Sequence, residues 1–162
     1  MRLNKTAFAI ATAATVLPAL LLAGHGHAQQ DHSRHHATQA DDLKWSQPAA
    51  YAKGAELAVV SGDPTKEGFY VVRLRVPAGF RIAPHTHPND ENVTVLSGTF
   101  HVGTGETFDT AKGATVKVGG FAHVGKGMTH YAYFPEATVI QLHGMGPQGI
   151  TYVNPADDPR KK

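Results

Sequence analysis

Residues 79–98 read GFRIAPHTHPNDENVTVLSG, and the rest of the chain is interpreted outward from this stretch. Side chains of a β-strand alternate between its two faces, so His85 and His87 are expected to point the same way. Pro88 to Asp90 is typical of a turn, and Glu91 stands at the head of the next strand-like run. Two imidazoles and a carboxylate this close suit a metal ion, but a surface strand can show the same pattern by chance.

The sequence after Trp45 predicts an all-β domain. Runs with strand character alternate with glycine-rich or proline-containing turns, and none has the length and 3.6-residue period of a substantial helix. In residues 69–76, FYVVRLRV, apolar side chains alternate with Arg73 and Arg75, which predicts one buried and one wet face. Many short strands at close spacing are typical of a sandwich or barrel. The expected strands are 57–60, 69–76, 92–96, 99–102, 115–118, 121–124, 129–134, 137–143 and 150–153.

The first 28 residues have the pattern of a secretory signal peptide. Arg2 and Lys5 precede a mostly apolar stretch from residue 7 to 23, and the segment ends in Gly-His-Ala, which predicts cleavage after Ala28. A retained transmembrane anchor is the alternative, but Pro18 and the shortness of the apolar stretch weaken it. The mature protein is therefore expected to be periplasmic or secreted, with no stable membrane insertion.

Residues 29–44 are polar and without periodicity, which predicts a disordered linker. Its histidines, His32, His35 and His36, could bind a divalent metal loosely, although a plain soluble linker is the simpler explanation. The expected barrel then spans residues 45–156, and residues 157–162 form a polar C-terminal tail.

Charge and cysteine content narrow the classes of function. Without Arg2 and Lys5 the chain has 13 basic and 13 acidic residues, so no excess of positive charge points to nucleic acid as a partner. The chain has no cysteine, which excludes disulfides and thiolate metal sites. Stability must come from the core, with help from a bound metal or a partner subunit.

Two segments resemble the two motifs of the cupin superfamily. In the first, Gly79 is followed after five residues by His85-x-His87, after three more by Glu91, and after six more by Gly98. Residues 119–134, GGFAHVGKGMTHYAYF, resemble the second motif, with Gly119, Gly127 and His130 at the expected spacing. Gly125 stands where that motif usually has proline, and Phe134 where it usually has asparagine. Neither departure removes a metal ligand.

The resemblance implies a single-domain cupin jelly-roll β-barrel, also called a double-stranded β-helix, over roughly residues 45–155. It further implies that His85, His87, Glu91 and His130 converge on one metal inside the barrel. Three imidazoles and one carboxylate accept most divalent first-row transition metals, so Fe, Mn, Ni, Cu, Co and Zn all stay open.

Further side chains are candidates for the surroundings of the metal. Counting alternate residues from His130 places Ala132 and Phe134 on the inner face, which predicts a partly apolar pocket. His143 precedes a glycine and is the next candidate, although packing is the simpler explanation. His101 and His123 are weaker candidates, because a lone strand histidine is more often structural or exposed.

The resemblance favours an exported, metal-dependent oxidoreductase, dioxygenase-like, that acts on a small organic molecule, with Glu91 as a base. Decarboxylation and sugar isomerisation fit the same ligands. The alternatives are a non-catalytic module that binds a small ligand or a metal, and a scaffold with a vestigial site. Resemblance also implies a homodimer, with residues 45–60 at the contact.

Overall fold

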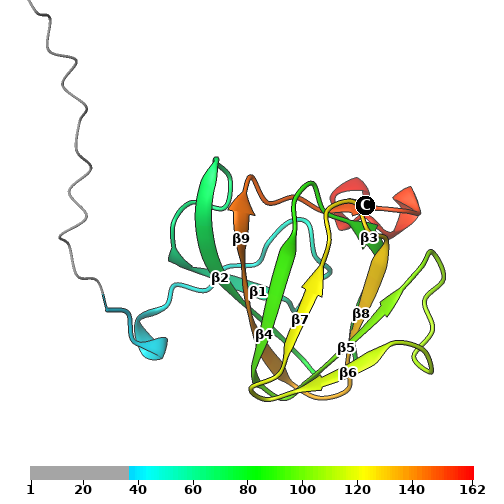
Figure 1. The fold of residues 1–162 in the computed structure, drawn as a ribbon, viewed down its shortest axis with the longest axis horizontal. Helices are drawn as coiled ribbons and strands as arrows, with labels where there is room; N and C mark the ends of the chain where they lie inside the picture. Colours follow the sequence, from blue (N-terminus) through cyan, green and yellow to red (C-terminus); the bar gives the residue numbers. More distant parts are fainter. Residues whose placement is uncertain (1–36) are drawn as a thin grey trace, which may run out of the picture. The chain divides into compact units, whose positions relative to one another are not determined.

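The computed structural model describes residues 37–162, so the predicted signal peptide and the three linker histidines lie outside the described residues. The elements are three 3₁₀ turns and ten strands (Figure 1). In chain order they are η1 (Ala40–Asp42), β1 (Glu56–Ser61), β2 (Gly68–Val76), β3 (Phe80–Thr86), β4 (Glu91–Ser97), β5 (Thr99–Thr104), β6 (Ala114–Lys117), β7 (Phe121–Val124), β8 (His130–Phe134), β9 (Thr138–Gly146), β10 (Thr151–Tyr152), η2 (Pro155–Asp157) and η3 (Pro159–Lys161).

The strands form two five-stranded sheets, and every pairing is antiparallel. The first sheet has the order β1-β2-β9-β4-β7 and the second has the order β10-β3-β8-β5-β6. Several neighbours, such as β2 and β9 or β3 and β8, are distant in sequence, so strands from the two halves of the chain lie side by side in each sheet (Figure 1). This is the predicted jelly-roll barrel.

Alternation along the strands builds the core between the sheets. In β2 the residues Tyr70, Val72, Leu74 and Val76 are buried and the arginines between them are only partly buried, as the sequence pattern predicts. β4 and β9 repeat this two-residue period, and their buried side chains meet aromatic and aliphatic residues of the second sheet. The core formed in this way combines aliphatic side chains of β2, β4 and β9 with Phe80, Phe100 and Phe134 from β3, β5 and β8.

Packing begins before the predicted end of the linker at residue 44. Residues 40–42 form η1, and Leu43 is buried because it is the first large apolar side chain after the polar segment. The predicted tail is polar but lies on the fold. The Arg160 guanidinium pairs with the Asp158 carboxylate, with Nε 2.7 Å from Oδ1, and donates to the Ile150 carbonyl oxygen at 3.1 Å.

Residues 45–60 pack on their own barrel. β1 pairs with β2, and the Arg75 guanidinium lies over the Trp45 ring at 4.4 Å from its centroid. Tyr51 and Ala55, from the segment before β1, are both part of the core. Within residues 37–162 no helix has the length and apolar character needed to cross a membrane.

We expect the substitutions Gly79→Ala and Gly98→Ala to destabilise the protein by different amounts. Both glycines have left-handed backbones, with φ of +76° and +75°, so either alanine costs about 1–2 kcal/mol in backbone strain. A Cβ at position 79 meets nothing within 4 Å, whereas one at position 98 would lie 2.6 Å from the Ala137 carbonyl oxygen and would also clash with Thr138.

Because of this overpacking, Gly98→Ala should lower the free energy of unfolding by roughly 1–3 kcal/mol more than Gly79→Ala does. Urea unfolding of both variants measures the difference in the free energy of unfolding. Equal losses would contradict the close packing of the β4–β5 turn against the start of β9.

Candidate metal centre

The four predicted ligand side chains come together from both sheets. His85 lies near the end of β3, His87 follows that strand, and His130 begins β8 in the same sheet. Glu91 begins β4 in the other sheet. All four are buried, and ligand atoms of the three histidines lie within 4.8 Å of one another. The turn at residues 88–90 carries the chain from one sheet to the other.

A β-bulge in β3 turns His85 toward the interior. Ile82 pairs with Ala132 and His85 pairs with His130, so three steps along β3 correspond to two along β8. In a regular strand His85 would face away from Ile82, because they are an odd number of residues apart. The extra residue restores the inward direction, and both side chains are buried.

Backbone carbonyl groups fix the orientation of all three imidazole rings. The Nδ1 atom lies 2.7 Å from the Ala83 oxygen in His85, 2.6 Å from the Gly149 oxygen in His87, and 3.1 Å from the Met128 oxygen in His130. A carbonyl oxygen only accepts hydrogen bonds, so each Nδ1 must carry the proton. In a neutral ring the Nε2 atom then has a free lone pair, which is the form that binds metal.

The Nε2 atoms converge with Glu91 on one point. The His85 and His87 Nε2 atoms are 3.2 Å apart, and with both protons on Nδ1 no hydrogen bond joins them. Glu91 Oε1 is 3.4 Å from Nε2 of His87, and its Oε2 is 3.8 Å from Nε2 of His130. Adjacent ligands on a metal with bonds of about 2.1 Å are separated by about 3.0 Å, so these residues fit a divalent metal.

Electrostatics keep the ligands in the forms that a metal needs. Burial, followed by the charges of His130 and His87, lowers the pKa of His85 to about 3, so this ring is neutral near pH 7. Burial by itself raises the pKa of Glu91, but its close approach to the His130 ring and the positive charge of the neighbouring histidines in their protonated forms outweigh burial. The pKa of Glu91 is therefore lowered, and the carboxyl is ionised.

Three tyrosines that sequence reasoning did not single out lie near predicted ligands. The Tyr152 ring lies 6.0 Å from the His85 ring, centroid to centroid. Burial and the charge of Glu91 raise the pKa of Tyr51, and the same two causes raise that of Tyr70 to about 12. The cue in the sequence was the burial period of β2, which placed Tyr70 on the inner face without indicating its distance from Glu91.

The inner face of β8 is as the parity argument predicts. Ala132 and Phe134 are both buried in the core together with His130 on the same strand face. Phe134 packs against the rings of Phe80 and Phe100, at centroid distances of 6.3 and 5.5 Å. Phe134 stands four residues from His130, roughly 13 Å along a strand, so it belongs to the core rather than to the surroundings of the metal.

His101, His123 and His143 lie on outer faces of the sheets, away from the four ligands. The His101 ring contacts Thr115 Oγ1 at 3.1 Å and the Lys112 oxygen at 2.6 Å. Nδ1 of His123 lies 3.0 Å from Asn92 Oδ1. Each alternates with a buried neighbour, which is why the strand carries it outward.

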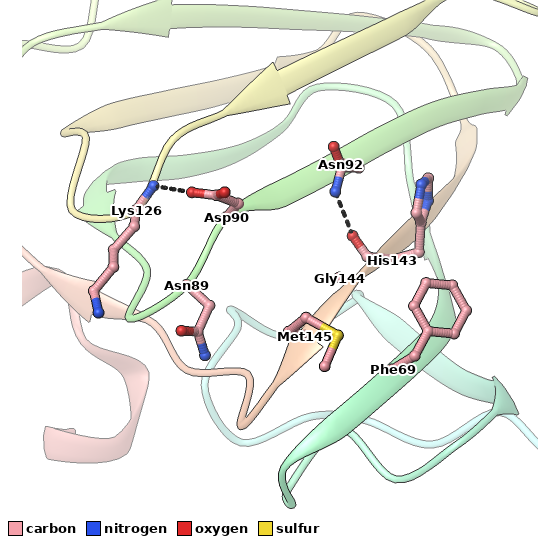
Figure 2. Close-up of a pocket in the computed structure, with 8 residues that line it drawn as sticks. All are labelled: Phe69, Asn89, Asp90, Asn92, Lys126, His143, Gly144 and Met145. Carbon is pink, nitrogen blue, oxygen red and sulfur yellow. Dashed lines mark hydrogen bonds between the residues drawn. The ribbon is translucent and has the colours of Figure 1, made fainter.

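His143 belongs to a separate pocket of about 340 Å³ on the outside of β2, β4 and β9, shown in Figure 2. Its ring is tilted against Phe69 at 6.2 Å and Phe121 at 6.3 Å. Asn92 donates to the His143 carbonyl oxygen, and the Lys126 backbone N–H donates to Asp90 (Figure 2). The glycine after His143 faces inward, toward the metal ligands, as the burial period of β9 requires.

A family model described as the ChrR cupin-like domain matches residues 33–148. The match includes both motifs and all four ligands. A comparison with curated protein sequences finds no match.

Solved structures share the fold at low sequence identity. The polyketide cyclase RemF from Streptomyces resistomycificus is 16% identical with a TM-score of 0.65, and the alignment covers 79% of this chain and 92% of that one. A candidate acetylacetone dioxygenase from Methylibium petroleiphilum PM1 is 22% identical with a TM-score of 0.59, covering 78% and 85%. An acetylacetone dioxygenase from Acinetobacter johnsonii is 14% identical with a TM-score of 0.56, covering 77% and 80%.

We expect the metal-free protein to lose stability as the pH falls from about 6.5 toward 3. In this interval the unfolded chain protonates His85 and the folded chain does not, because the folded pKa is about 3 against an ordinary 6.5. The unfolded state thus binds more protons, and one such group lowers the free energy of unfolding by up to about 1.4 kcal/mol per pH unit. Glu91, with its lowered pKa, adds a loss in the same direction below its ordinary value of 4.5.

Urea unfolding of chelator-treated protein between pH 7 and pH 4 measures this dependence. His85→Asn removes the titrating ring. Between pH 6.5 and 5 its free energy of unfolding should therefore change less steeply with pH than that of the wild type, by up to the contribution of one proton. The same slope in both proteins would contradict a neutral, buried His85.

Proposed function

Because the chain belongs to the ChrR cupin-like domain family, we propose that it is an exported metalloenzyme that oxidises a small organic molecule with dioxygen. One divalent first-row metal would be held by His85, His87, Glu91 and His130. The observation that carries this proposal is the set of three Nδ1–H···O=C hydrogen bonds, which direct three Nε2 lone pairs to one point beside a carboxylate.

The bound metal would supply Lewis-acid chemistry and, with a redox-active ion, electron transfer to dioxygen. The protein supplies four ligands, so an octahedral ion keeps two positions for other molecules. His87 is tied to the segment before β10 through the Gly149 oxygen, so the loop between β9 and β10 helps to hold the site together. The rigid strands keep the ligands in place without further cost on binding.

Glu91 has two roles in this proposal. Its ionised carboxylate offsets half of the charge of a divalent ion in a buried site, where an uncompensated charge is costly. It is also the only carboxylate among the four ligands, and its ionised form would be the base that accepts a proton from a substrate C–H or O–H group. The proton would then reside on a Glu91 carboxylate oxygen.

Two fold neighbours support the dioxygenase-like reaction over decarboxylation or isomerisation. They are described as acetylacetone dioxygenases, one of them a candidate, and each aligns with more than three quarters of this chain. Their low identity leaves the substrate of this chain to experiment, and 1,3-diketones are the first compounds to test.

Export is proposed from the leader sequence alone. Residues 1–28 carry a basic start, an apolar centre and a small-x-small end. Mass spectrometry of the intact protein from the periplasm or culture medium should find a mature chain that begins at Gln29. A chain that retains Met1 and fractionates with membranes would contradict cleavage.

Metal content and oxygen uptake test the metalloenzyme proposal together. Protein purified from its own compartment should contain about one transition-metal ion per chain and consume oxygen with a 1,3-diketone or a related keto compound. His130→Ala removes one ligand, so its metal affinity should fall more than the 10- to 100-fold typical of losing a supporting partner of a ligand.

His101→Ala is the matched control, because His101 is a strand histidine bonded on the outer face. It should keep both metal and oxygen uptake. Stoichiometric metal without oxygen uptake on a broad panel of substrates would contradict the dioxygenase-like role and leave a metal-binding module. Absence of any stoichiometric metal would contradict the site itself.

A further inference from the structure

Tyr70, Gly144 and Glu91 form a row across three neighbouring strands of one sheet. Tyr70 on β2 pairs with Gly144 on β9, and Asn92 on β4 pairs with His143, which puts Glu91 next to Gly144. All three positions face the interior. Strands lie about 4.8 Å apart, so the middle position decides whether the outer two side chains can approach each other.

Gly144 leaves that middle position open. A Cβ placed there would lie 3.6 Å from the Tyr70 hydroxyl oxygen and 2.7 Å from the Asp90 carbonyl oxygen. The Tyr70 phenol therefore reaches over β9 toward the strand that carries Glu91. A Cβ at position 144 would clash with the Asp90 carbonyl oxygen and would only just contact the phenol, so the glycine allows the close approach of β4 and leaves the Tyr70 hydroxyl uncovered on this side.

The hydroxyl groups of Tyr51 and Tyr70 have no hydrogen-bond partner among residues 37–162. Two other tyrosines do: Tyr131 donates to the Asp109 oxygen and Tyr152 to the Ala50 oxygen, each at 2.9 Å. Tyr51 is only 8% exposed and Tyr70 only 2%. Among the described residues, His143 Nδ1 is the only side-chain polar atom that is both fully enclosed and without a hydrogen-bond partner. The Tyr51 and Tyr70 hydroxyl oxygens also lack a partner in this part of the chain, so they are not fully enclosed and each retains some accessible surface.

Both phenols lie near the predicted ligand Glu91. Tyr51 interacts electrostatically with Glu91, Tyr70 and Tyr152. Tyr51 also lines a pocket of about 290 Å³ together with Gly149, the residue whose carbonyl oxygen orients His87. Much of the remaining lining is apolar, with Pro48, Ala50, Leu57, Pro64 and Ile150. Arg160 also lines it, but its guanidinium is engaged by Asp158 and the Ile150 oxygen.

We propose that the Tyr51 and Tyr70 hydroxyls donate hydrogen bonds to an acceptor oxygen of a small, mainly apolar ligand bound beside the four metal ligands. This inference rests on the proposed metal site and names the ligand class that the site takes. A buried hydroxyl without a partner is unfavourable in the empty protein, and an oxygen of the ligand removes that deficit. Enolates and carboxylates with short apolar bodies have the required chemistry, because each combines a strong acceptor with an apolar remainder.

Tyr51→Phe and Tyr70→Phe test the proposal with zinc-loaded protein, in which the redox-inert ion leaves the probe unconsumed. The probe is acetylacetone, whose enolate carries two acceptor oxygens. Calorimetric titration should show each variant binding the probe about 10- to 100-fold more weakly, the effect of losing one hydrogen bond to a charged group. Zinc content by mass spectrometry should be unchanged.

Tyr133→Phe is the matched control, because Tyr133 lies on the outer face of β8 beside Arg81, whose guanidinium is 5.6 Å from its ring centroid. It should bind the probe like the wild type. The melting temperature without probe is a second readout. Tyr51→Phe and Tyr70→Phe should melt at or above the wild-type temperature, because neither hydroxyl is bonded in the empty protein. A lower melting temperature would assign the hydroxyls a structural role and overturn the proposal.

The outcomes separate this inference from the proposed function. Zinc bound stoichiometrically, with probe affinity within twofold of wild type in both variants, overturns the role of the tyrosines and leaves the metal site standing. Zinc bound without any binding of acetylacetone by the wild type overturns the ligand class. Failure of the wild type to hold zinc refutes the metal site, and the inference falls with it.

Discussion

The hydrogen bonds from three histidine Nδ1 atoms to three backbone carbonyl oxygens are the constraint on which the site depends. They set the tautomer and the rotation of each ring, so that the metal-binding edges face one point. Two of these carbonyl groups are local, because His85 and His130 each use the residue two positions earlier. The third comes from Gly149, so the segment between β9 and β10 must dock before His87 is fixed.

The barrel supplies what these hydrogen bonds require. One sheet contributes the histidines and the other contributes Glu91, so the site exists only when both sheets are in contact. The bulge in β3 lets an apolar run and a histidine share one face. At the same end of the sandwich, Gly144 on β9 places no side chain between Tyr70 on β2 and Glu91 on β4. Polar groups thus gather at one end, while the aliphatic and aromatic core fills the remainder.

Much of this arrangement could be predicted from the sequence, for identifiable physical reasons. The two-residue period of FYVVRLRV gave the inner face of β2, and motif spacing gave the jelly roll and the convergence of His85, His87, Glu91 and His130. Parity from His130 gave the burial of Ala132 and Phe134. These features depend on local alternation or on fixed spacing, which a single sequence carries.

The remainder depends on contacts between distant segments. Local pattern does not reveal the bulge in β3, the docking of Gly149 on His87 or the approach of Tyr70 to Glu91. The histidines at positions 101, 123 and 143 resembled site residues by type, yet their strands direct them outward. Residue type alone could not decide this, because the face of a strand residue depends on register, and register is set by partner strands.

X-ray absorption spectroscopy of the metal in purified protein tests the central claim most directly. The account predicts the multiple-scattering signature of three imidazole rings bound through nitrogen, with oxygen ligands completing the sphere, at about 2.0–2.2 Å. The same measurement on His130→Ala should show the signature of two imidazole rings instead of three. A metal coordinated by one imidazole or none would contradict the convergence of His85, His87 and His130 on a single ion.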